Sequence, residues 1–340
     1  MNLDFLTDKT STPEIVALEE KVKWGTSGTL YRLHDVAHDL ALLPDPTYQS
    51  LYADGSLKAV FIQAKKTVGM GTFSCSARYQ CLLAVNPGDT RRGLGKRILG
   101  ESKNFALKDI GKRGIVYAYI EDGNERSKKI FNALGYRRIG GYASHAFSRT
   151  FPKDNENVFT ADKDERIIIS GLLKKLYADH ILTEFDKSVH ESDYYIYKDG
   201  TGIIAGLQVV PQHWTLLELP GVSGKFFVNL MPRIPGLRML LDPPGFRCLR
   251  ISNVYIRDGR ESEFFSLVSA VLAQNKLHNA VVQWDQSSPV AKRIAAAGSY
   301  GFFGSMSVTS ASVMAVFKNF SDNEIEEICK RPVSISPLDP

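Results

Sequence analysis

The amino-acid sequence predicts an α/β protein built from two similar halves, and three observations support this fold class. A strand-like run at Tyr79–Val85 leads through a glycine-containing basic loop into a helical stretch, and a second strand at Gly114–Glu121 leads into a second helix. The order strand, helix, strand, helix returns over Cys248–Gly298. With 340 residues, of which 44% are hydrophobic, the chain exceeds one ordinary domain and can bury a sizeable core.

The first half is expected to begin with helices and to continue as strands. Its pattern predicts a helix near Pro13–Trp24 and a polar, helical region through about Tyr52. Runs of branched and aromatic residues then predict three strands, with a turn at the paired lysines between the first two. The expected strands are Leu57–Gln63, Val68–Ser74 and Tyr79–Val85, with closing strands at Arg137–Tyr142 and His145–Phe151. A polar segment beginning at Pro152 is expected to link the halves.

The loop after the third strand has the character of an anion-binding cradle. Residues 86–95 pass through a Pro/Gly turn into a basic stretch in which Gly93 and Gly95 open a long helix. A helix N-terminus presents unpaired backbone N–H groups and the positive end of its dipole, and the glycines let a phosphate approach the main chain. The loop lacks the Gly-Lys-Ser/Thr ending of a P-loop and the three-glycine spacing of a dinucleotide fingerprint. It predicts a phosphorylated ligand of another kind.

A second helix start follows the next strand. Asn124 is a good N-cap, Ile130 and Leu134 share one helix face, and Gly135 is suited to end the helix. The order of elements is therefore strand, glycine loop, helix, strand and capped helix.

These two segments carry a family resemblance. Thr90–Gly95 is similar to the GNAT superfamily pattern Gln/Arg-x-x-Gly-x-Gly/Ala, except that Thr stands at its first position. Asn124–Tyr136 matches the superfamily pattern Asn-x-x-Ala/Ser-x-x-x-Tyr/Phe-x-x-Leu-Gly-Phe/Tyr at every spacing. The chain thus resembles GNAT N-acetyltransferases, which implies a central mixed, mostly antiparallel sheet flanked by helices, here repeated twice.

The resemblance also implies acetyl-CoA as cosubstrate. In the GNAT fold the strands that carry the two motifs splay apart, and the pantetheine arm threads the gap. The cofactor-binding residues that the resemblance implies are Leu83, Ala84, Val85, Thr90, Arg91, Arg92, Gly93, Leu94, Gly95, Lys96, Asn124 and Phe131.

The catalytic groups are less clearly indicated. Acyl transfer to an amine needs a base for the ammonium, a polarised thioester carbonyl and a proton for the departing thiolate. GNAT enzymes commonly use a Tyr of the second motif as the acid, and this chain has Phe131 there. Glu121 is the candidate base, with a solvated strand-end carboxylate as the alternative, and Tyr119 stands where some relatives carry a catalytic Glu, with an ordinary strand aromatic as the alternative.

The second half resembles the first without its phosphate loop. Strands are expected at Tyr194–Tyr197, Gly202–Val210, Cys248–Ile256 and Ala280–Trp284, helices at about Ser262–Lys276 and Pro289–Ala297, a Pro/Gly-rich insertion at Pro211–Gly245, and closing runs at Phe302–Val308 and Ser312–Phe317. Its turn after Ile256 contains Asp258 and a single glycine, Gly259, and such an acidic loop would repel CoA. The predicted organisation is a GNAT acetyl-CoA-binding domain at 1–152, a degenerate GNAT-like domain at 158–320 and a C-terminal tail at 321–340, with an unrelated α+β domain as the alternative for the second half.

Composition excludes several classes of protein. Residues 91–138 contain 13 basic and 5 acidic side chains, next to the phosphate loop, but no nucleic-acid motif accompanies them. The four cysteines form no Cys-x-x-Cys pair, and His34 and His38 lack a third ligand, so neither a disulfide framework nor a metal site is expected. The sequence shows no leader and no long apolar run, from which we expect a cytoplasmic protein that does not enter a membrane.

Two functions remain open at this level. The first is an acetyl-CoA-dependent N-acetyltransferase acting on a primary amine of a small molecule or peptide. A homodimer is compatible with this function. The second is a non-catalytic acyl-CoA-binding or scaffold protein. The sequence does not distinguish a polyamine, an aminoglycoside, an amino acid, an amino sugar or a protein N-terminus as acceptor.

Overall fold

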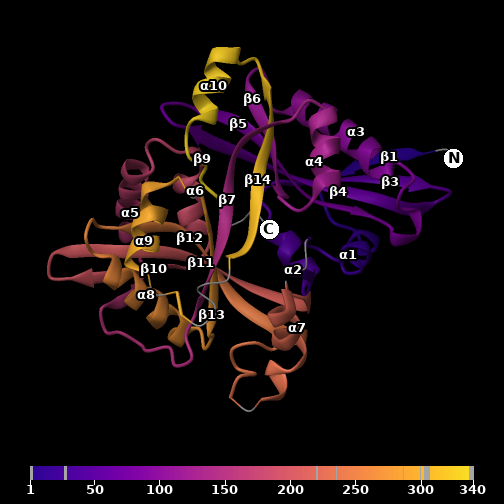
Figure 1. The fold of residues 1–340 in the computed structure, drawn as a ribbon. Helices are drawn as coiled ribbons and strands as arrows, with labels where there is room; N and C mark the ends of the chain where they lie inside the picture. The colour runs from indigo at the N-terminus through magenta and orange to yellow at the C-terminus, as the bar shows by residue number, and fades with distance from the viewer. Residues whose placement is uncertain are drawn as a thin grey trace.

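One continuous sheet of 14 strands organises the protein (Figure 1). The computed structural model describes residues 3–26, 29–219, 221–234, 236–285, 287–298, 300–301 and 307–336. Along the main path of the sheet the strand order is β1-β3-β4-β5-β6-β14-β7-β13-β12-β11-β10-β8, while β2 pairs with β11 and β9 pairs with β4.

The elements of the two halves follow the same order, except that the second half adds α7 and α10. The first half contains β1 (Asp4–Asp8), α1 (Pro13–Glu19), β2 (Leu30–Leu33), α2 (Val36–Ala41), β3 (Pro46–Ala53), β4 (Ser56–Met70), β5 (Ser74–Val85), α3 (Leu94–Asp109), β6 (Gly114–Glu121), α4 (Glu125–Ala133) and β7 (Arg137–Ser148). The second contains β8 (Val158–Thr160), α5 (Lys163–Leu176), β9 (Ile181–Thr183), α6 (Phe185–Glu191), β10 (Tyr194–Asp199), β11 (Gly202–Glu218), α7 (Gly221–Asn229), β12 (Phe246–Ile256), α8 (Glu261–Gln274), β13 (Asn279–Trp284), α9 (Pro289–Ala297), β14 (Ser307–Lys318) and α10 (Asp322–Cys329).

The strand order is symmetric about its centre. β5 and β6 are parallel neighbours in the first half, as are β12 and β13 in the second, and the other pairs are antiparallel. Reading outward from the centre, β14 and β7 occupy equivalent places, followed by β6 and β13, β5 and β12, β4 and β11, and β3 and β10. The internal repeat expected from the sequence is therefore present as a repeated sheet.

The halves exchange strands. β7, which ends the first half, pairs with β13 of the second, and β14 returns from the second half to lie between β6 and β7 in the middle of Figure 1. β2 and β9 make a second, reciprocal exchange by pairing with β11 and β4. We propose that residues 1–152 and 158–320 are repeats that do not fold separately, because each lacks strands that the other supplies.

Several local expectations were wrong. Residues 46–53 form β3 instead of a helical region, and β4 runs unbroken through Lys65 and Lys66, where a turn was expected. Lys66 is buried, and its Nζ lies 2.7 Å from Oε2 of Glu184 in the second half. The turn was expected because two charged side chains usually mark a solvent-exposed bend. The buried Lys66 instead finds its partner in a residue 118 positions away, which the local pattern does not show.

The two pairs of closing strands are each one strand. β7 continues through Ala143 and Ser144, which separate the two strands expected at Arg137–Tyr142 and His145–Phe151. A Cβ on Gly140 would lie 2.6 Å from Cγ1 of Val333, and one on Gly141 would lie 2.9 Å from the carbonyl oxygen of Ala311, so these glycines allow close packing within a strand. β14 likewise runs unbroken from Ser307, and residues 302–306 of the expected run lie outside the described residues. β11 also continues through Pro211 to Glu218, into the expected insertion.

Helix α3 covers one face of the first-half strands. Its buried residues Leu94, Ile98 and Leu99 pack with Phe61 of β4 and Val116 of β6. Because Leu94 begins the helix and is itself buried, this packing holds the N-terminus of α3 beside the end of β5.

No helix among the described residues is both long and apolar enough to cross a bilayer.

Glu19 ends α1 as a buried carboxyl group. Neither of its oxygens has a hydrogen-bond partner among the described residues, and burial raises its pKa well above the ordinary range. The folded protein therefore holds the proton of Glu19 more tightly than the unfolded chain does. The stabilisation from this bound proton is present below the ordinary carboxyl pKa and is lost as the pH rises through the pKa of Glu19 in the folded protein.

We expect Glu19→Gln to raise the melting temperature at pH 8 and to change it little at pH 5, measured by calorimetry. Glu20→Gln, on the exposed neighbour, is the matched control, and an equal gain from both variants would contradict the prediction.

Candidate functional site

A cavity of about 360 Å³ opens where β5 and β6 separate and extends to the second half. The two strands pair from Ser76 with Gly114 to Gln80 with Ala118, but β5 continues to Val85 and β6 to Glu121. On the other side of β5, the pairing with β4 shifts between Val60 and Ile62, next to Leu82, whose φ is +51°. This β-bulge turns the end of β5 away from β6. The splayed strands that the GNAT resemblance implies are thus present.

Both halves form the walls of this cavity. The first half contributes the strand ends, including Leu83, Tyr119 and Glu121, and the start of α4 with Asn124 and Phe131. The second half contributes β11, β12 and β13 through Trp214, Phe246, Arg250, Asn279 and Gln283. Side chains of the second half therefore form the wall opposite the splayed strands.

The loop before α3 has the backbone shape of an anion cradle. Arg91 and Gly93 both have positive φ, +67° and +79°, and Gly93 is the N-cap of α3 without any side-chain cap. The first backbone bond of the helix runs from the Arg97 N–H to the Gly93 carbonyl, so the N–H groups before it point out of the helix end. Successive amides in such alternating conformations form a concavity for anions.

The side chains around this loop also suit a phosphate group. Asp89, the acidic residue of the loop, is held by Arg92 Nη1 at 3.0 Å and by Lys58 Nζ at 3.4 Å. Arg91 and Lys96 are exposed. A Cβ on Gly93 would meet no atom within 4 Å, so the space beside this backbone is open.

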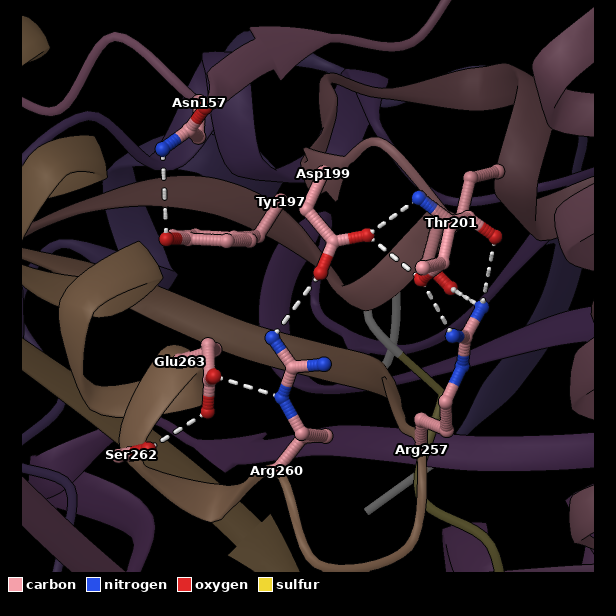
Figure 2. A network of polar contacts seen from close by, with 9 residues as sticks. Asn157, Tyr197, Asp199, Thr201, Arg257, Arg260, Ser262 and Glu263 are labelled. Atoms are coloured by element: carbon pink, nitrogen blue, oxygen red, sulfur yellow. Dashed lines mark hydrogen bonds and ion pairs between the residues drawn. The ribbon is translucent and has the colours of Figure 1, made fainter.

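The equivalent loop of the second half is closed by its own side chains (Figure 2). Arg260, before α8, donates from Nη2 to Asp199 at 3.1 Å and from Nε to Glu263 at 2.6 Å. Arg257 donates to Thr201 Oγ1 at 2.8 Å. These guanidinium groups already have anionic or polar partners, which supports the expectation of a degenerate second phosphate loop.

The strand gap of the second half is also filled. Asp285 directly follows β13 and Ser288 is the N-cap of α9, so they correspond to Glu121 at the end of β6 and to Asn124, the N-cap of α4. The C-terminal segment closes this place: the N–H of Val333 donates to Asp285 Oδ2 at 3.0 Å, and the remaining cavity there is about 30 Å³. That volume suits one water molecule, so the larger cavity of the first half is the place for an extended ligand.

Glu121 is a half-buried carboxylate on the wall of the large cavity. Its Oε2 accepts a hydrogen bond of 2.7 Å from Thr26 Oγ1, and burial raises its pKa above the ordinary range despite that bond. Asp39 of α2 also faces the cavity, and burial raises its pKa to about 6 against the opposing effect of Arg250. Two carboxyl groups with raised pKa values therefore lie on this wall, and each is a candidate to accept a proton.

Tyr119 and Phe131 line the cavity near these carboxyl groups. The ring of Tyr119 lies 5.1 Å from that of Tyr79 and 5.4 Å from that of Tyr142, measured between centroids. Phe131 is buried edge-on against Tyr136, at 4.7 Å. Its ring supplies an apolar surface and no proton, as the sequence indicated.

The structure brings together only part of the predicted site. Five predicted residues line the cavity, namely Leu83, Tyr119, Glu121, Asn124 and Phe131. Thr90, Arg91 and Arg92 lie on the exposed loop outside it, and Lys96 lies in the first turn of α3, with Gly93 and Gly95 at the helix start. Because the side chains of Ala84 and Leu94 are buried, these residues offer a ligand only their backbone. Val85 lies beside Gly95. Asn124 Oδ1 accepts from the Ser127 N–H at 3.0 Å, which confirms its helix-capping role.

Other residues of the site were not predicted. They are five residues from five different segments: Thr26 before β2, Tyr31 in β2, Asp39 in α2, Trp214 in β11 and Arg250 in β12. No local pattern marks them, because they meet only through the strand exchange. Among the described residues, no group of three or more potential metal ligands gathers.

Comparisons with known proteins concern the architecture. No family model and no curated protein matches the chain. Among solved structures, N-myristoyltransferase of Saccharomyces cerevisiae with bound myristoyl-CoA is 7% identical, with a TM-score of 0.61 over 93% of this chain and 83% of that one. A tandem GNAT protein from the clavulanic acid biosynthesis pathway is 12% identical, with a TM-score of 0.57 over 94% of this chain and all (100%) of the other. Such low identities establish the fold alone, and the chain has the fold of tandem GNAT proteins.

Proposed function

We propose that the protein is an acyl-CoA-dependent acyltransferase, and more narrowly that it moves an acetyl group to a primary amine of a small molecule or peptide. One observation carries the proposal: the open strand gap beside the α3 cradle leads into a cavity that also contains the partly buried carboxyl group of Glu121. The fold supports it, since the compared structures include a transferase with bound myristoyl-CoA.

The proposed roles follow from this arrangement. The backbone N–H groups at Gly93–Lys96 and the side chains of Arg91 and Lys96 bind the pyrophosphate, because the helix start and the basic loop are both positive. The end of β5 at Leu83–Val85 pairs with the pantetheine arm and offers N–H groups to polarise the thioester carbonyl. Bound acyl-CoA would supply the activated acyl thioester.

Glu121 has the role of general base. It takes a proton from the acceptor ammonium, and the neutral amine then attacks the carbonyl carbon to form the C–N bond. The C–S bond breaks with release of the CoA thiolate, and the nitrogen gives up its second proton to become the amide, so that one proton is available to return to the thiolate. A raised pKa suits this role because it brings the base closer to the working pH. Since Phe131 carries no proton, we assign the return of a proton to the thiolate to the Tyr119 hydroxyl acting through water.

Calorimetry and thiol release test the proposal together. We expect the full chain to bind acetyl-CoA at one site and to release CoA thiol from it when primary amines are added. Stronger binding or faster turnover of long acyl-CoA esters would show that the transferred group is a longer acyl chain and not acetyl. Binding without thiol release on any amine would favour the non-catalytic acyl-CoA-binding alternative, which the lack of an acidic hydroxyl at Phe131 also supports. If no acyl-CoA binds, both functions are refuted.

A further inference from the structure

The charged side chains of the large cavity are few. Among the described residues that line it, Asp39, Glu121 and Arg250 are the charged ones. Arg250 lies close enough to Asp39 to lower the pKa of that carboxyl group, so these two charges offset one another. No basic side chain of the described residues forms an ion pair with Glu121, whose bonded neighbour is the neutral Thr26. The carboxylate of Glu121 can therefore pair with one positive charge on a ligand.

Part of the wall opposite the splayed strands is aromatic. The rings of Tyr31 and Trp214 lie 5.1 Å apart, and those of Trp214 and Phe246 lie 6.3 Å apart in a stacked arrangement. All three rings are half-buried and line the cavity, together with the aliphatic side chains of Leu33, Leu216 and Leu241. Such a wall binds flat or apolar groups by burying their surface and disfavours groups rich in hydroxyls.

Tyr31 connects the aromatic wall with the charged groups. It stands on β2, which crosses from the first half to pair with β11, and its register partner there is Leu216. The pKa of its hydroxyl is raised by burial and by the nearby Glu121, with Arg250 opposing. The aromatic wall and the single uncompensated carboxylate thus meet at one residue, so a ligand can contact both at once.

We propose that the acceptor is a monocationic primary amine on an aromatic or other apolar body, an arylalkylamine in chemical class. This inference rests on the amine acyltransfer proposed above. The ammonium lies at Glu121, where it loses its proton, and the ring packs on Tyr31, Trp214 and Phe246. A polyamine or an aminoglycoside would bring further positive charges that find no uncompensated carboxylate, and an amino sugar would place hydroxyls against the apolar wall.

Four probe amines test the proposal at saturating acetyl-CoA: phenethylamine, spermidine, glucosamine and kanamycin. We expect kcat/KM for thiol release to be at least about 100-fold higher with phenethylamine than with the other three. Trp214→Ala should raise the KM for phenethylamine about tenfold and leave the KM for acetyl-CoA unchanged, while Trp214→Phe should retain most of the affinity. Phe226→Ala, which removes an exposed ring of α7 outside the cavity lining, is the matched control and should change neither constant.

The outcomes separate this inference from the proposed function. Preference for spermidine, glucosamine or kanamycin would overturn the inference and leave acyl transfer standing. A Trp214→Ala variant that alters turnover of long acyl-CoA esters instead of amines would assign the aromatic wall to the acyl chain and also overturn it. If no amine releases thiol, the proposed function fails, and calorimetric titration of phenethylamine into the wild type and Trp214→Ala still decides whether this wall binds an aromatic amine.

Discussion

Replacing Glu121 by Gln should lower kcat for amine acetylation about 100- to 1000-fold, the range expected when a general base is removed. The amide keeps the shape of the side chain and can still meet Thr26, but it cannot accept the ammonium proton. Because Glu121 lies at the end of β6, away from the α3 cradle, the dissociation constant of acetyl-CoA should change little. Single-turnover kinetics and calorimetry on the same preparation measure the two quantities.

The pH profile gives a second reading of the same variant. The base must be ionised, so kcat/KM of the wild type should rise with pH through a limb that lies above the ordinary carboxyl pKa, because burial raises the pKa of Glu121. This limb should disappear in Glu121→Gln. Asp39→Asn is the informative comparison, since Asp39 has a pKa of about 6 in the same cavity. If Asp39→Asn causes the large loss and Glu121→Gln does not, the base is Asp39.

Replacing Gly93 by Glu should abolish measurable binding of acetyl-CoA, a loss of at least about 100-fold in affinity. The new carboxylate would enter the open space beside the loop backbone, where the pyrophosphate is proposed to bind, and would repel it. Calorimetric titration of the folded variant with acetyl-CoA measures the loss.

The second half provides the control for backbone strain. Gly259 has a φ of +74°, close to the +79° of Gly93, and a Cβ on it would likewise meet no atom within 4 Å. Gly259→Glu therefore imposes a similar conformational cost and the same added charge in the closed loop of the second half. We expect it to bind acetyl-CoA like the wild type. Loss of binding in Gly259→Glu alone, or two sites per wild-type chain, would show that the second loop is a cofactor site.

Local signals were sufficient wherever neighbouring residues determine the structure. The start of α3 at Leu94, the cap at Asn124 and the strands β5 and β6 beside them follow from capping chemistry and from runs of branched residues, and all are present. The repeat was also visible, because its second copy keeps the order strand, helix, strand, helix over 248–298.

Errors arose where distant residues decide the outcome. The short strand β2 was missed because its partner, β11, lies in the other half, and the turn expected at Lys65–Lys66 was wrong because Glu184 neutralises a buried lysine there. The division of β7 between Tyr142 and His145 was wrong for a similar reason, because Ala143 pairs with Trp284 of β13 and with Ser310 of β14.

The sequence by itself determined the tandem repeat, and it predicts a phosphate-binding loop at Thr90–Gly95 and the loss of that character in the second half. These properties depend on residues adjacent in the chain, such as glycines at a helix start or an aspartate in a turn. Only the tertiary structure decided that the halves exchange β7, β14, β2 and β9, and that Glu121 faces Tyr31, Trp214 and Arg250 across one cavity. The reason is physical: a strand's partner and the burial of a carboxyl group depend on contacts between residues far apart in sequence, which local pattern does not encode.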